Sequence, residues 1–322
     1  MGNVKGILCI VMSLLLVLVG CESDSSIGSH SEKLQIMTTL FPQYDFARII
    51  AGDKADVTLL LPPGMEAHSY EPTPADMIKI NKADLLVYTG ESMEQWAHTM
   101  IESIDSNAVY VLDVSKNVPL LEPNQTSEES DDHDHNHDDH EEHTEDDGHH
   151  HAYDPHIWTS PKNAMIMVNN ILEALCELDP ENAAYYEENA KLYLAELESL
   201  DNEFKDIVEN AKRETIYHAG RFAMQYLTHE YGIHYVSAPF EAEPSAALVA
   251  QMIKDIKEQE IPAIYHEELV DPKIAQMISD ETGVQMLLLH SCHNVSKEDF
   301  NQGVTYLSLM KQNVENLRMG LN

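Results

Sequence analysis

The sequence alternates short apolar runs, rich in β-branched residues, with amphipathic stretches, and this alternation restricts the fold more than any other feature. In the first half, four runs have the length and composition of buried strands, at 34–39, 56–61, 84–89 and 109–114. Helical periodicity falls between and after them, at about 42–52, 74–82 and 92–105. Strands that alternate with helices form parallel sheets, so this half predicts an α/β lobe.

The second half repeats the rhythm. Strands are expected at 215–218, 234–237, 263–266 and 285–290, and helices at about 221–231, 245–259, 271–282 and 303–319. The repetition predicts a second α/β lobe, and therefore a cleft between two lobes with mostly parallel sheets.

A single long helix is expected to join the two lobes. Asp179 and Pro180 are typical of a helix start, and apolar residues then recur every three or four positions from Tyr186 to Ile207. About 30 residues at 1.5 Å each form a rod of roughly 45 Å, which is longer than a small domain is wide. We interpret it as a spine helix, and a coiled-coil segment is the competing interpretation. A stiff spine predicts that the lobes hinge little when ligand binds.

The N-terminus predicts export and a lipid anchor. Lys5 precedes an apolar stretch, Ile7–Val19, that is too short for a stable membrane span. The tetrad "LVGC" follows and resembles the bacterial lipobox, which implies cleavage before Cys21 and lipidation of that cysteine. An ordinary secretory peptide with an incidental cysteine is the alternative.

These signals divide the chain into a signal peptide (1–20), a lipidated cysteine with its tether (21–33), an N-terminal lobe (34–165), connecting helices (166–211) and a C-terminal lobe (212–322). Cys176 and Cys292 are the cysteines left for the folded body. They could form one disulfide outside the cell.

The charge balance indicates cations as partners. Lys and Arg total 19 against 56 Asp and Glu, a formal net charge of −37. Such a chain repels nucleic acid phosphates and anionic lipid headgroups, so no nucleic acid partner is expected.

An acidic, histidine-rich loop spans about 122–152. Residues 128–151 hold twelve acids and eight histidines without apolar periodicity, so this stretch cannot bury a core and is expected to be disordered without metal. Its histidines are His133, His135, His137, His140, His143, His149, His150 and His151. Many weak ligands favour a loop that gathers metal near a tighter site, and the alternative is a solubilising acidic linker.

Four other histidines differ from these by their context. His68 lies in the loop "PPGMEAHSYEPTP", His156 lies in "DPHIWTSPKNA" before a helix, and His218 and His290 end the strands "ETIYH" and "QMLLLH". The carboxyl ends of parallel strands face the ligand crevice, so these side chains could converge in the cleft between the lobes. Neutral imidazoles from different elements suit a tetrahedral zinc ion. For each histidine taken singly, a hydrogen-bonded, partly buried side chain is the alternative.

The motifs "GMEAHSYEPTPADM" and "DPHIWTSPKNA", with the histidine-rich insertion and the long helix around them, resemble the zinc and manganese substrate-binding lipoproteins of bacterial ABC transporters (cluster A-I, solute-binding protein family 9). The stretch "ALVAQMIKDIKEQEIPAIYHEELVDPK" resembles the C-terminal lobe of that family. The resemblance covers essentially the whole mature chain.

The resemblance implies a ligand set with two departures. His68 and His156 match the first two metal-binding histidines of the family with their flanking residues. Arg221 stands where the third ligand belongs in "YHAGRFAMQYLTHEYG", so His218, three residues earlier, either replaces that ligand or lies behind the ligands.

At the fourth position the family has Asp followed by Ser, and here His290 is followed by Ser291, with His293 close by. The expected ligands are therefore His68, His156 and His290, completed by His218 or a water. Glu66 and Glu267 could orient imidazoles or supply an oxygen, and each could equally be an ordinary solvated or helix-capping acid.

An imidazole-rich site favours Zn²⁺, because Mn²⁺ prefers more carboxylate oxygens and higher coordination. The resemblance implies a cell-membrane lipoprotein, anchored on the extracytoplasmic face, that captures zinc and delivers it to an ABC permease and its ATPase. The alternatives are a manganese uptake protein, a surface lipoprotein for metal sequestration or adhesion, and a zinc hydrolase. The hydrolase lacks support because "HEELV" and "HEYGI" miss the second histidine of HExxH.

Overall fold

The computed structural model describes residues 33–67, 70–90, 93–94, 96–104, 108–122, 153–239 and 242–322. Residues 33–322 form one compact unit, which contains every described residue. Cys21, His68 and the eight histidines of the acidic segment lie outside the described residues.

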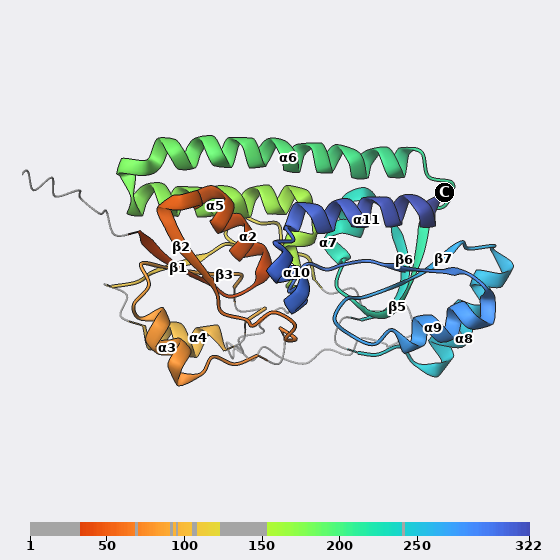
Figure 1. Cartoon of the computed structure of the whole chain (residues 1–322). Coiled ribbons are helices and arrows are strands. Elements are labelled where there is room, and N and C mark those ends of the chain that lie inside the picture. The colour runs from red at the N-terminus through yellow and green to blue at the C-terminus, as the bar shows by residue number, and fades with distance from the viewer. Residues whose placement is uncertain are drawn as a thin grey trace, which may run out of the picture. The chain divides into compact units, whose positions relative to one another are not determined.

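A four-stranded parallel sheet forms the core of the first lobe (Figure 1). Its strands are β1 (Leu34–Thr38), β2 (Ala55–Leu59), β3 (Leu85–Tyr88) and β4 (Tyr110–Asp113), in the order β2-β1-β3-β4. Ile36 of β1 lies opposite Val57 on one side and Leu85 on the other. Buried parallel strands require such continuous apolar runs, and "LLVY" in β3 is one of them.

The second lobe repeats this order. Its strands are β5 (Thr215–Phe222), β6 (His234–Pro239), β7 (Ala263–His266) and β8 (Gln285–Leu288), in the order β6-β5-β7-β8. Chain order reverses between β1 and β3 in one sheet and between β5 and β7 in the other. Parallel sheets bind ligands outside the carboxyl ends of strands at such a reversal, so each lobe offers one potential binding edge.

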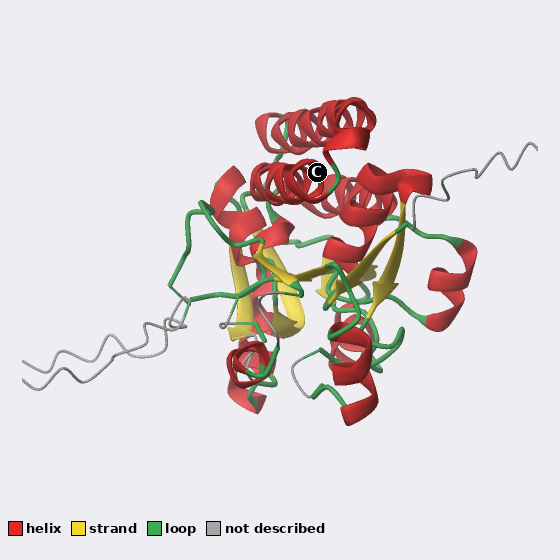
Figure 2. Ribbon diagram, turned by 90° about the vertical axis from the view of Figure 1, so that its left-hand side faces the viewer, coloured by secondary structure: helices red, strands yellow, loops and turns green. Residues whose placement is uncertain are grey.

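Helices lie on both sides of the two sheets (Figure 2). They are α2 (Phe41–Ala51), α3 (Pro74–Ile80), α4 (Ala97–Glu102), α5 (Pro161–Leu178), α6 (Ala183–Glu209), α7 (Gln225–Tyr231), α8 (Ala246–Glu258), α9 (Lys273–Thr282), α10 (Lys297–Gln302) and α11 (Tyr306–Leu321), with 3₁₀ turns at Gly52–Lys54, Ile157–Thr159 and Pro180–Asn182. Hydroxyl side chains begin several of them. Ser160, for example, accepts a hydrogen bond from Asn163 N at the start of α5.

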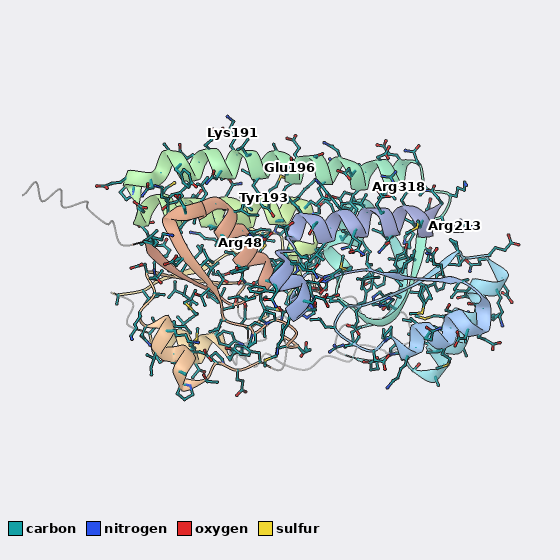
Figure 3. All side chains as sticks on the ribbon, viewed as in Figure 1. Arg48, Lys191, Tyr193, Glu196, Arg213 and Arg318 are labelled. Atoms are coloured by element: carbon teal, nitrogen blue, oxygen red, sulfur yellow. The ribbon has the colours of Figure 1, made fainter. Side chains whose placement is uncertain are left out.

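The spine helix is α6, and it packs against α2 of the first lobe and α11 of the second. Its 27 residues correspond to roughly 40 Å. Tyr193 faces the neighbouring helices and is 4% exposed, whereas Lys191 and Glu196 point outward (Figure 3). The two lobes with parallel sheets and one long helix therefore confirm the predicted fold class.

Several predicted boundaries were wrong. β5 continues to Phe222, so α7 begins only at Gln225 and not at residue 221. α4 is shorter than predicted, and α10 precedes the last helix without having been predicted. Pro180 begins a 3₁₀ turn, and α6 begins at Ala183. The division of the chain at 34–165, 166–211 and 212–322 stays a prediction.

The two cysteines of the folded body are not paired. Within the described residues, Cys176 in α5 and Cys292 after β8 are both free thiols, so the suggested disulfide is not formed. None of the helices among the described residues is both long and apolar enough to cross a membrane.

One carboxyl group of the first lobe is fully buried at the carboxyl ends of β1 and β3. Glu94 accepts hydrogen bonds from the Thr39 hydroxyl and from Thr89 N, the latter at 3.1 Å. Burial raises the pKa of Glu94 to about 8 in spite of these donors. In the unfolded chain the pKa of this group is near 4.5. Between pH 4.5 and about pH 8 the folded state therefore holds a proton on Glu94 that the unfolded chain has lost.

Glu94→Gln should therefore flatten the pH dependence of stability. The folded wild-type protein loses stability as pH rises from about 4.5 to 8, because the buried carboxyl group must either hold its proton or become charged without solvent. The variant should gain stability relative to wild type across this window, by on the order of 5 kcal/mol at its upper end. Urea unfolding of the metal-free protein at pH 5 and pH 8 measures the difference. Glu188→Gln, on the exposed side of α6, is the control, and equal pH slopes for all three proteins would contradict the assignment.

Candidate metal centre

One cavity gathers most of the predicted site residues from both lobes. It is lined by Glu66, His156, His218, Arg221, Ala223, Met224, Glu267, Leu289, Ser291 and His293. His156 and His218 were expected as ligands, and Glu66, Glu267 and His293 as supporting residues. His68 lies outside the described residues, although Glu66, two residues earlier, lines the cavity. His290 is not among the lining residues.

The motif "DPHIW" holds His156 at the cavity through its own side chains. The buried Asp154 carboxylate accepts hydrogen bonds from His156 N at 2.8 Å and from His156 Nδ1 at 3.0 Å. A carboxylate accepts only, so Nδ1 carries the proton and Nε2 carries the lone pair. Ile157–Thr159 then form a 3₁₀ turn, in which Thr159 Oγ1 donates to His156 O at 2.8 Å.

Contacts with the second lobe fix the same motif from outside. Trp158 Nε1 donates to Ser291 O at 2.6 Å, and Tyr306 Oη donates to Trp158 O at 2.6 Å. Tyr226 Oη donates to Asp154 O at 2.9 Å and accepts from Leu121 N at 3.0 Å. The backbone that carries His156 is thus tied to three elements distant in sequence.

A bulge in β5 brings two side chains of this strand to the cavity. Tyr217 pairs with Val236 and Arg221 pairs with Ala238, so β5 contains two more residues than its partner over this stretch. In a regular strand, residues 218 and 221 would point to opposite faces, whereas the bulge lets both line the cavity. Gly220 leaves the necessary space, because a Cβ there would lie 3.1 Å from Glu267 Oε1 and 3.4 Å from His218 Cε1.

His218 is a neutral imidazole. Burial lowers the pKa of His218 to about 4, and the electrostatic effect of His266 lowers it slightly further. The backbone of Gly220 and the charge of Glu268 act in the opposite direction. Its Nδ1 is buried and has no hydrogen-bond partner among the described residues. A neutral ring with an unengaged nitrogen is the form that binds a metal ion.

Arg221 introduces a positive charge into the cavity. Its Nε lies 3.6 Å from Glu267 Oε2. Burial raises the pKa of Glu267, and the Arg221 guanidinium opposes that rise. The pair is close to neutral when both groups are charged, so Glu267 shields the imidazoles from the guanidinium.

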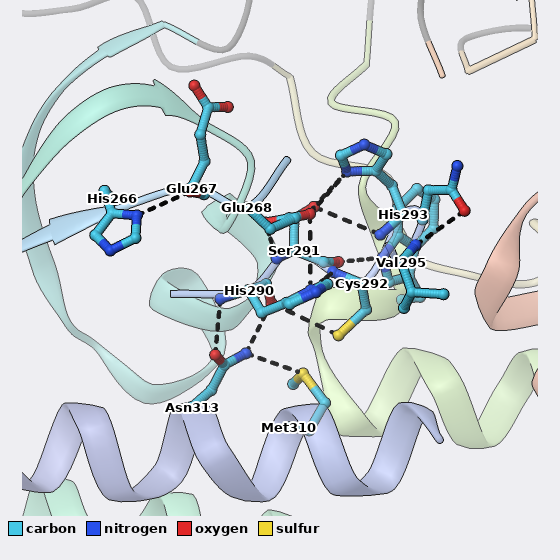
Figure 4. A network of polar contacts seen from close by, with 12 residues as sticks. His266, Glu267, Glu268, His290, Ser291, Cys292, His293, Val295, Met310 and Asn313 are labelled. Atoms are coloured by element: carbon cyan, nitrogen blue, oxygen red, sulfur yellow. Dashed lines mark hydrogen bonds and ion pairs between the residues drawn. The ribbon is translucent and has the colours of Figure 1, made fainter. Parts of the chain in front are cut away.

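The ring nitrogens of His290 and His293 make different hydrogen bonds. The Nδ1 atom of His290 accepts a hydrogen bond from Cys292 N at 2.9 Å, and its backbone is bonded to Asn313 of α11 through N and O, both at 2.8 Å (Figure 4). A neutral ring that accepts through Nδ1 holds its proton on Nε2, so His290 has no unengaged lone pair. His293 lines the cavity, and its Nε2 is buried without a partner among the described residues.

No feature of the sequence favours His293 over His290, since both residues follow β8 and lie three positions apart. The distinguishing signal is in the tertiary structure, namely which nitrogen of each ring is occupied. In the described part of the chain, no group of three or more His, Cys, Asp or Glu residues is gathered tightly enough to hold a metal ion.

The two-lobed fold with a lined inter-lobe cavity is that of a solute-binding protein. A family model described as "Zinc-uptake complex component A periplasmic" matches residues 36–320, and the chain belongs to this family. The high-affinity zinc uptake system protein ZnuA of Bacillus subtilis (strain 168) is 35% identical over 321 residues, which cover 98% of this chain and 97% of that protein.

Two further comparisons involve Streptococcus pneumoniae. The zinc-binding lipoprotein AdcA of strain ATCC BAA-255 / R6 is 34% identical over 309 residues, which cover 94% of this chain but only 58% of AdcA. The crystal structure of the Zn(II)-bound ZnuA-like domain of AdcA superposes with a TM-score of 0.73 at 30% identity, covering 90% of this chain and 99% of that domain. This chain therefore corresponds to the ZnuA-like part of AdcA.

Tyr226→Phe should destabilise the protein by about 1–3 kcal/mol, because it removes the acceptor of Leu121 N and the donor to Asp154 O in a buried position. Urea denaturation of the metal-free protein measures the loss. Tyr110→Phe is the matched control, since the Tyr110 hydroxyl makes an exposed 3.4 Å contact with Glu177. Equal stability of the two variants would mean that Tyr226 does not fix the His156 motif.

Proposed function

We propose that the protein is an extracytoplasmic lipoprotein, anchored through Cys21, that captures zinc and delivers it to an ABC permease and its ATPase. Membership of the zinc-uptake family and the similarity to the zinc uptake protein of B. subtilis support the proposal. The observation that carries it is the cavity, in which three imidazoles from distant elements face one space.

The proposed ligands are His156, His218 and His293, completed by His68 from the loop after β2. This set replaces His290 with His293, because the Nδ1 of His290 is occupied by Cys292 N. The Nε2 of His293 and the Nδ1 of His218 have no partner among the described residues, so a metal ion can bind at either atom without breaking a hydrogen bond. Zinc binding would draw the rings together from their metal-free positions.

Four imidazole ligands favour zinc over manganese. Glu66 and Glu267 also line the cavity, but Glu267 is paired with Arg221. A paired carboxylate is a weaker oxygen ligand, and a neighbouring guanidinium disfavours a site that depends on carboxylates. The alternative of a manganese-specific protein therefore has less support from this cavity.

The site is proposed to act by binding and release rather than by catalysis. Four protein ligands would close the coordination sphere of zinc, whereas catalytic zinc keeps one position for water or substrate. The histidine-rich segment is proposed to gather zinc beside the cavity, and the lobes to dock on the permease.

Zinc stoichiometry of the chain from Glu22 onward tests the ligand set. His156→Ala, His218→Ala and His293→Ala should each weaken the tight site by more than about 100-fold, because a lost ligand has a larger effect than a lost outer partner, which changes affinity about 10–100-fold. His290→Gln and the exposed His234→Ala should leave it unchanged. Competition with a chromophoric chelator measures each affinity. Tight binding that survives in His293→Ala but disappears in His290→Gln would favour His290 as the ligand, as the sequence predicted.

Deletion of residues 128–151 should keep one tight zinc and remove the weaker equivalents. The base of the segment is closed independently of it, since Asp154 N donates to Leu121 O at 2.8 Å and Gln225 Nε2 donates to Glu122 O at 2.7 Å. In the full chain the weaker equivalents should be present at pH 7.5 and largely lost at pH 5.5, below the ordinary histidine pKa of about 6.5. Isothermal titration at both pH values provides the count. If the deletion abolished all zinc binding, the segment itself would be the working site.

A further inference from the structure

Glu268 is a buried carboxylate directly behind the cavity. It follows β7, and both of its oxygens accept hydrogen bonds from one residue of the other strand end: Ser291 N at 2.9 Å to Oε2 and Ser291 Oγ at 2.5 Å to Oε1. His293 Nδ1 lies 3.0 Å from Oε1. Figure 4 shows the carboxylate between the rings of His293 and His290.

The charge of Glu268 is stabilised by these neighbours. Three groups face this carboxylate and can donate to it, namely Ser291 N, Ser291 Oγ and His293 Nδ1. A buried carboxylate without partners would be strongly unfavourable, so its presence requires these donors.

Of the two imidazoles, His293 is the one that donates to Glu268. His290 Nδ1 is 3.7 Å from Oε1 and already accepts from Cys292 N, so it has no proton for the carboxylate when the ring is neutral. His293 Nδ1 faces Glu268 Oε1 and Ser291 Oγ. Because Ser291 Oγ gives its own proton to Glu268, the proton between His293 and this pair belongs to Nδ1.

We propose that Glu268 is a positioning residue for the metal site: it fixes the ring of His293 and its Nδ1–H tautomer, so that Nε2 presents its lone pair to the cavity. The inference rests on the proposed function, because it treats His293 as a zinc ligand. A carboxylate behind a ligating imidazole also raises the basicity of the ligating nitrogen.

The same arrangement recurs at His156, which also lines the cavity. His156 Nδ1 lies 3.0 Å from the buried Asp154 carboxylate, as His293 Nδ1 lies 3.0 Å from that of Glu268. His218 differs, since its Nδ1 has no hydrogen-bond partner among the described residues. Two rings of the site are therefore held in advance by carboxylates, and His218 adjusts to the ion.

Glu268 could instead serve only the fold, by satisfying Ser291, and a double-mutant cycle separates the two roles. The variants are Glu268→Gln, His293→Ala and the combination, and the readouts are zinc affinity by chelator competition and free energy of unfolding by urea. Glu94→Gln is the matched control, because Glu94 is also buried and bonded to a hydroxyl and a backbone N–H, but it lies in the first lobe.

We expect Glu268→Gln to weaken zinc binding about 10–100-fold in the otherwise unchanged chain and to have almost no further effect once His293 is Ala. Glu94→Gln should leave zinc affinity unchanged. An equal loss in both backgrounds, or no loss from Glu268→Gln, overturns the positioning role. Tight zinc binding by His293→Ala would overturn the positioning role of Glu268 but not the proposed zinc-binding function. The absence of tight zinc from the unsubstituted chain would overturn the proposed function itself.

A second measurement needs no variant and covers the case in which Glu268→Gln fails to fold. Long-range ¹H–¹⁵N spectra of the metal-free protein, labelled at histidine, report which nitrogen carries the proton. At a pH high enough to neutralise the ring, His293 should show the Nδ1–H tautomer and His290 the Nε2–H tautomer. An Nε2–H tautomer for His293 would overturn the proposal.

Discussion

The segment after β8, residues 289–295, holds the site together, and we call it the junction segment. His293 O accepts from Phe41 N, Val295 O accepts from Gly64 N, and Ser291 O accepts from Trp158 Nε1. Asn294 Nδ2 donates to Pro62 O and Met65 O. A strand end of the second lobe is therefore bonded to three separate parts of the first, and the same segment carries His293.

This junction restricts how the two lobes can move. Opening the cavity by a large rotation would break buried backbone hydrogen bonds at the junction segment, and each would leave an unsatisfied group. The spine helix α6 packs on helices of both lobes as well. Movement between the lobes is thus limited by the junction segment as well as by the stiff spine helix. Ligand capture would therefore depend on side chains and on loops such as the one that carries His68. The amount of movement on zinc binding stays a prediction.

Much of the fold could be predicted because it depends on local periodicity. The apolar positions of α6 and the runs that became β1, β3 and β7 are set by burial of one face or of both, which is visible in sequence. The extension of β5 to Phe222 could not be predicted, since a bulge depends on the partner strand and on the space left at Gly220. That local error concealed how His218 and Arg221 reach the same cavity.

The sequence does not separate His290 from His293, for a related reason. Both histidines follow the same strand, and the family pattern pointed to the first. What separates them is the direction of single hydrogen bonds: Cys292 N donates to one ring, whereas the other ring donates to a carboxylate that follows β7. Glu268 itself carried no signal, because it stands beside Glu267 in "HEELV" and either residue could have faced the cavity. Both residues lie beyond the end of β7, so only the tertiary structure shows that Glu267 lines the cavity whereas Glu268 contacts Ser291 and His293.

The described residues that flank the histidine-rich segment are bonded to α7 beside this site. Both of its ends are fixed on α7, through Tyr226 at Leu121 and Asp154 and through Gln225 at Glu122. Asp154 also orients His156, so a residue just after the segment is bonded to a proposed ligand. Zinc bound along the segment would remain tethered to the protein, and such tethering raises the effective concentration at the cavity without any additional contact. Under the proposed function, the strongly negative charge of the chain would attract the ion, the segment would bind it weakly, and the imidazoles held by Asp154 and Glu268 would form part of the tight site.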